Sequence, residues 1–272
     1  IGIYGLEGRR ANQLAEASAA PALAPSDSDE RQWRTRYKEA AGLIAVAERQ
    51  TANRDQTDDA VGPLFDRIRV LRDAAAKAED PDPKRATKLA HQALQCYAAV
   101  LMSMPEESYF FVLPGNDVDE DGFFMAVRLV TVREFADWAN RTQWRTMLDS
   151  EYPGQPVGTS LFYDAQAYAA EQKMRIPSRS EWQRAFDARP DALATEIPEW
   201  TRDIVSGDPD ASDAPTFGYE LATVSTEFDA DGNSTPPTFR PMPYFAPGES
   251  IGFRCVVPID TGPEAMRKLF GP

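Results

Sequence analysis

The stretch Leu161–Trp182, LFYDAQAYAAEQKMRIPSRSEW, decides the fold. Apolar residues recur at helical spacing in its first half, and Ser160 stands where a cap for that helix is expected. Pro177 lacks a backbone donor and disfavours the α conformation before it, so the helix should end there. Ser178 and Glu181 then have the spacing of a capping box. The stretch therefore predicts two helices joined by a short connection.

Similar signals lie on both sides of this stretch. Tyr109–Gly115 and Gly122–Val130 are apolar runs typical of strands. Thr131, with a glutamate three residues later, predicts another capped helix. Further on, the motifs PEWTRD at 198–203 and SIGFRCVV at 250–257 each combine an aromatic residue with charged ones.

In this order, the segments resemble the formylglycine-generating enzyme (FGE)/sulfatase-modifying factor domain, a relative of the C-type lectin fold. The resemblance runs from about Glu107 to Pro258. It implies an α+β fold class with much irregular structure, and we expect this FGE-sulfatase-like domain over residues 105–260. Only Asn116–Asp121 connects the two predicted strands, so the domain is a shortened version of the family pattern.

The residues outside this domain have a different character. Residues 1–28 are rich in Ala, Pro and Ser and are expected to be a tail or linker. Residues 29–104 contain three amphipathic stripes with helical spacing, which predict an N-terminal α-helical bundle or hairpin. Residues 261–272 are expected to be a C-terminal tail with a single helical turn.

Composition limits the partners and the chemistry. The net charge of −14 disfavours nucleic acid and anionic membranes, so membrane contact is expected only through an upstream anchor. The chain has one histidine, His91, and two cysteines, Cys96 and Cys255. These form no disulfide framework and no zinc-type cluster.

The resemblance implies a copper chemistry that this sequence lacks. Catalytic members of the family oxidise a cysteine of their substrate at a copper ion. A pair of their own cysteines, shortly before the GFR motif, binds this ion, because thiolates are the ligands that select Cu(I). The matching stretch here, Phe239–Pro247, has no cysteine, and Cys255 inherits no catalytic role. Another branch of the family holds iron with three histidines, and His91 is alone. We therefore expect a pseudoenzyme with no catalytic residues.

One acidic turn leaves two interpretations open. Asp117, Asp119 and Asp121 match the first half of a calcium-binding D-x-D-x-D-G loop, but Arg128 stands where a bidentate glutamate belongs. The turn is either a structural calcium site or an acidic hairpin turn. No other cofactor is expected.

The long loops between Ser206 and Pro247 are the expected ligand or partner face. Their aromatic residues offer contact area between polar groups, although some of them are equally suited to cover the core. The candidates are Tyr219, Phe228, Phe239, Arg240, Tyr244 and Phe245.

The function expected from these observations is a non-catalytic recognition or structural module, a protein-interaction subunit of a larger, membrane-associated or surface assembly. The alternatives are a divergent enzyme on the same fold and a calcium-dependent, glycan-binding lectin-like protein. The start at Ile1 and the Ala/Pro-rich segment favour an extracytoplasmic location, whereas two unpaired cysteines are equally compatible with the cytosol.

Overall fold

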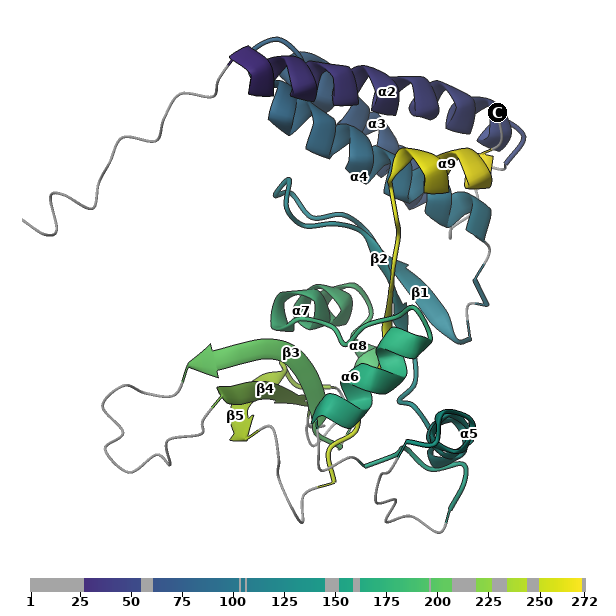
Figure 1. Cartoon of the computed structure of the whole chain (residues 1–272), viewed down its shortest axis with the longest axis vertical. Helices are drawn as coiled ribbons and strands as arrows, with labels where there is room; N and C mark the ends of the chain where they lie inside the picture. The colour runs from purple at the N-terminus through teal and green to yellow at the C-terminus, as the bar shows by residue number, and fades with distance from the viewer. Residues whose placement is uncertain are drawn as a thin grey trace, which may run out of the picture.

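The computed structural model describes residues 27–54, 61–102, 104–105, 107–144, 152–158, 162–195, 197–206, 219–226, 234–243 and 250–270. Its helices and small antiparallel sheets confirm the α+β class. Figure 1 shows a helical layer at one end of the molecule, a small sheet at the other, and the β1–β2 hairpin between them. The predicted linker 1–28 lies almost entirely outside the described residues.

The helical layer consists of α2 (Asp27–Thr51), α3 (Gly62–Ala78) and α4 (Pro83–Met102). α4 packs against both other helices and is buried over most of its length, because alanines and leucines fill nearly its whole circumference. One apolar cluster joins the three helices and continues into Phe124 and Ile259. The helical layer and the sheet below it therefore share a core.

The chain end returns to this layer. Residues 263–270 form helix α9 (Pro263–Phe270), which packs against α2 and α4 and buries Met266 and Phe270. Figure 1 shows α9 lying along the helical layer. The 261–272 stretch, expected as a tail with one turn, forms a longer helix because its apolar residues share one face.

The central sheet has the strand order β1–β2–β6, formed by β1 (Tyr109–Val112), β2 (Phe123–Ala126) and β6 (Val256–Pro258). All strand pairs are antiparallel. Every residue of β2 is buried, since Phe124 faces the helical cluster while Phe123 and Met125 face a second cluster around α7. This two-sided burial explains the unbroken apolar run, although the strands are shorter than predicted.

The remaining helices are α5 (Val132–Thr142), α6 (Phe162–Glu171), α7 (Arg179–Ala188) and the short α8 (Pro190–Leu193). Both predicted capping boxes are present, at Thr131 for α5 and at Ser178 for α7. The proposed cap Ser160 lies outside the described residues. α6 ends at Glu171, before the predicted stop, because Lys173 adopts a left-handed conformation with φ of 58°.

A second antiparallel sheet has the order β3–β4–β5, with β3 (Glu199–Ser206), β4 (Tyr219–Ser225) and β5 (Thr238–Pro243). Trp200 of β3 is fully buried with α5 and α6. No helix in the described part of the chain combines the length and apolar character needed to span a membrane.

Candidate functional site

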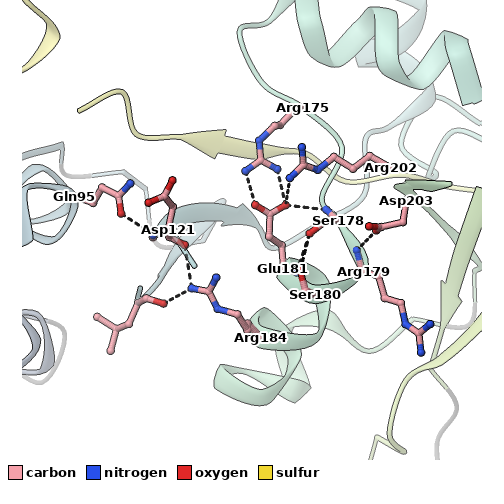
Figure 2. A network of polar contacts seen from close by, with 12 residues as sticks. Gln95, Asp121, Arg175, Ser178, Arg179, Ser180, Glu181, Arg184, Arg202 and Asp203 are labelled. Atoms are coloured by element: carbon pink, nitrogen blue, oxygen red, sulfur yellow. Dashed lines mark hydrogen bonds and ion pairs between the residues drawn. The ribbon is translucent and has the colours of Figure 1, made fainter. Parts of the chain in front are cut away.

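A charged network fixes the start of α7 (Figure 2). The Ser178 hydroxyl accepts the Glu181 N–H at 3.1 Å, and the Glu181 carboxylate accepts the Ser178 N–H at 2.8 Å. Arg175 donates to the same carboxylate at 2.6 Å, and Arg202 lies 3.5 Å from it. Burial alone would raise the pKa of Glu181, but these donors outweigh it and lower the pKa. A carboxylate held in this way orients a helix and is a poor general base.

A buried ion pair ties three parts of the domain together. Glu199 and Arg254 are 0% and 2% exposed, and their side chains meet at 2.6 Å. The Trp182 indole N–H donates to Glu199 at 3.2 Å. The Arg254 guanidinium also donates to the carbonyl of Val127 at 2.8 Å. Glu199 of PEWTRD and Arg254 of GFR thus meet in the core, where they connect β3, α7 and the end of β2.

The sulfur atoms do not form a metal site. Cys96 lies in the helical cluster, and Cys255 lies in the cluster around α5 and α6. Both are free thiols, and burial raises the pKa of each to about 12. Burial lowers the pKa of His91, which lies 3.4 Å from the Thr261 hydroxyl. Since a copper site needs adjacent thiolates, these residues do not fit the copper ion of the catalytic relatives.

The acidic turn docks onto the helical layer. Gln92 of α4 donates to the carbonyls of Asp117 and Glu120 at 2.9 and 3.2 Å, and Gln95 accepts the Gly122 N–H at 2.8 Å. Lys88 of α4 pairs with Asp119. Helix α4 therefore binds the backbone of this turn and one of its three candidate carboxylates, that of Asp119. The described residues contain no cluster of three or more Asp, Glu, His or Cys suited to a metal ion.

Calcium should therefore leave stability unchanged. We expect the midpoint of thermal unfolding to shift by less than about 1 °C between 5 mM EDTA and about 1 mM CaCl₂, since a ligand stabilises a fold only if it binds it. Differential scanning calorimetry measures the shift. An increase of several degrees that disappears in an Asp117→Asn/Asp119→Asn variant would establish calcium in this turn.

The predicted partner face is only partly described. Phe239 is half-buried, its ring centroid 6.3 Å from that of Trp182, and the Arg179 guanidinium lies 4.5 Å above it. Arg240 is exposed on β5. Tyr219 is the first residue of β4, and only its backbone is described. Phe228, Tyr244 and Phe245 lie outside the described residues. The structure thus places Phe239 over the core and brings Arg240 to the surface beside it.

A small cavity of about 90 Å³ lies between Tyr109, Tyr168 and Cys255. At its edge, Arg128 makes two hydrogen bonds of 2.7 Å to the Glu134 carboxylate. This hydrogen bonding, together with Thr131, lowers the pKa of Glu134 from 4.5 to about 2. The cavity has room for a few water molecules and is too small for a substrate.

The lowered pKa of Glu134 predicts a specific pH dependence. Because its pKa is lower in the folded state, the ionised carboxylate stabilises the fold above pH 4.5, and this contribution is lost as the pH falls toward 2. We expect Glu134→Gln to lower the free energy of unfolding by about 1 kcal/mol at pH 7, after allowance for solvent screening. The variant should then lose less stability than the wild type on acidification. Urea denaturation at several pH values measures both, with the exposed Glu264→Gln as control. An unchanged acid slope would contradict the assignment.

A hollow that is open to solvent runs along β1. It has a volume of about 830 Å³ and is lined by the ends of α3 and α4 on one side and the end of α7 on the other. Leu64, Ala99 and Val100 make its helical wall apolar. Arg54, Arg184 and Arg189 stand on its rim with a single carboxylate, Asp187. The hollow is thus an apolar groove with a net positive rim, and we call it the β1 groove.

The family assignment rests on the middle of the chain. Residues 97–192 match the family model described as Sulfatase-modifying factor enzyme 1-like domain (FGE-sulfatase). The chain therefore contains a domain of the FGE/sulfatase-modifying factor family, which confirms the family predicted from the sequence. The match starts inside α4, before the predicted boundary at residue 105. No curated protein is similar enough to the chain to serve as a relative.

Sequence reasoning missed two features. Glu199 and Arg254 belong to two motifs that carry the family resemblance. Nothing in the sequence spacing of the two residues indicates that their charges meet. The β1 groove combines residues from α3, α4, β1 and α7, which lie in different parts of the chain, so no local pattern marks it. The one available signal for the ion pair was Arg254, a single charged residue in the otherwise uncharged motif SIGFRCVV.

Proposed function

We propose that the protein is a non-catalytic member of this family that serves as a recognition or structural subunit of a larger protein assembly. The observation that carries the proposal is the state of the two thiols. Cys96 and Cys255 are buried in separate clusters, each with its pKa raised to about 12. Thiols protonated at neutral pH and held apart do not supply the thiolate pair that binds Cu(I).

Further support comes from the described charged groups. Glu181, Glu199 and Glu134 each accept hydrogen bonds from an arginine, so their role is to hold helices and strands in place. The β1 groove, by contrast, is open to solvent and large enough to receive part of another molecule. A fixed scaffold beside an open groove suits binding better than chemistry.

The proposal is tested by a copper titration followed by an activity assay. The full chain is titrated with Cu(I) against a competing chelator and then incubated with oxygen and a cysteine-containing peptide. We expect no stoichiometric copper binding and no aldehyde in the peptide, as measured by mass spectrometry. The Cys96→Ser/Cys255→Ser variant is the matched control. Aldehyde formation that requires either cysteine would overturn the proposal.

A further inference from the structure

We propose that the β1 groove binds an extended peptide segment of a partner protein, which adds to the open edge of β1 as a further antiparallel or parallel strand. The inference rests on the proposed recognition function and names its surface and the chemistry of its partner. The peptide would carry apolar side chains at its centre and carboxylates toward its ends.

β1 lies at the edge of its sheet. In the order β1–β2–β6, β1 pairs with β2 on one side and has no strand on the other among the described residues. The groove runs past Tyr109 and Phe111 on that strand and past Leu113 just after it. An uncovered edge offers main-chain donors and acceptors to another chain, which is the basis of strand addition.

The hydrogen bonds of the sheet determine which residues of β1 direct their backbone groups to the open edge. The Val127 N–H donates to the Ser108 carbonyl at 2.9 Å, and the Ala126 N–H donates to the Cys255 carbonyl at 3.0 Å. Odd-numbered residues of β2 thus bond toward β1, and even-numbered ones bond toward β6. With Phe110 opposite Met125, the backbone groups of Phe110 face β2, while those of Phe111 face the open edge.

Backbone groups at the two ends of this edge already have hydrogen-bond partners, whereas those in its middle have no backbone partner in the described part of the chain. The Tyr109 N–H donates to the Pro105 carbonyl at 2.9 Å, and Arg184 donates to the Leu113 carbonyl at 2.6 Å. Between them, the N–H and carbonyl of Phe111 have no backbone partner among the described residues. The edge therefore accommodates a short strand centred opposite Phe111.

The two walls of the β1 groove differ in chemistry, and together they favour a particular kind of peptide. Leu64, Ala99 and Val100 form an apolar surface on one side. On the other, the exposed Arg189 guanidinium lies 5.1 Å from the Phe110 ring centroid, and Asp187 already accepts a hydrogen bond from Gln183. Since the protein as a whole carries −14, three arginines around one groove favour carboxylates in the occupant.

The experiment uses the full chain and a displayed library of twelve-residue peptides. Peptides selected on the wild type are synthesised with a fluorophore, and their affinities are measured by fluorescence anisotropy. We expect an alternating apolar pattern flanked by Asp or Glu. Ala188→Trp should weaken binding at least about tenfold by filling the groove beside α7, and Arg189→Glu about fivefold to tenfold by reversing a rim charge. Arg133→Glu on α5, an equal charge change far from the groove, should have no effect.

A second set of peptides tests strand addition directly. Methylation of single backbone amides should abolish binding only at alternate positions of the segment opposite Phe111, because alternate N–H groups of a strand face β1. Equal tolerance at all positions, a failure to select any peptide, or binding unaffected by Ala188→Trp and Arg189→Glu would overturn the proposal. So would selection that succeeds only after residues 1–26 are removed, because the chain itself would then occupy the groove. None of these outcomes changes the result of the copper test. A failure of peptide binding in the β1 groove can therefore be distinguished from a failure of the proposed non-catalytic function.

Discussion

Replacing Arg254 with methionine should lower the free energy of unfolding by about 3–5 kcal/mol, because it leaves the buried Glu199 carboxylate without its counter-ion. The guanidinium is 2% exposed and also donates to the carbonyls of Val127 and Leu193. Methionine fills a similar volume, so the loss reflects charge and hydrogen bonding rather than a cavity. Chemical denaturation followed by circular dichroism measures the change.

Two further variants make this prediction specific. Arg69→Met removes an ion pair with Asp66 in which both side chains are at least 70% exposed, and it should cost less than about 0.5 kcal/mol. Glu199→Gln combined with Arg254→Met should recover part of the loss, since no unpaired charge then remains buried. An effect of Arg254→Met below about 1 kcal/mol would show that the pair is not buried in this way.

Truncating Phe270 to alanine should cost about 3–5 kcal/mol, because its ring is 1% exposed in the core of the helical layer. The side chain anchors α9 against α2 and α4, and Arg267 adds an ion pair to Glu39 at 2.7 Å. The same denaturation experiment measures the change.

The control for this variant is Lys268→Ala in the same helix. The Lys268 side chain is 76% exposed, so its removal should change stability by less than about 0.5 kcal/mol. If Phe270→Ala were as mild as Lys268→Ala, residues 263–270 would behave as a tail and α9 would not belong to the core.

The local signals of the sequence predicted the fold class well because each rests on short-range physics. The capping boxes at Thr131 and Ser178 need only residues three apart, and both are formed. The apolar stripes of 29–104 needed only helical periodicity, and they form α2, α3 and α4. Where stability depends on distant packing, prediction was weaker. α9 is stabilised by α2, more than 200 residues earlier in the chain, and the 261–272 pattern alone supported one turn.

The candidate site was less predictable for the same reason. The sequence left the acidic turn open between a calcium site and a hairpin turn, because sequence shows which oxygens are near one another and not which are already bonded. Gln92 and Gln95, which engage that turn, are ordinary residues of a helix in the sequence. The β1 groove arises where α3, α4, α7 and β1 end close together. The direction in which the Phe111 backbone groups point depends on the phase of the hydrogen-bond ladder, which no side-chain pattern encodes.

The central claim is that this domain keeps the scaffold of its family and uses it to bind another protein. The most direct measurement is native mass spectrometry of the protein purified from the cells that produce it, after mild cross-linking. We predict a complex with a different polypeptide, cross-linked beside the ends of α3 and α7. A protein that is recovered alone would contradict the account.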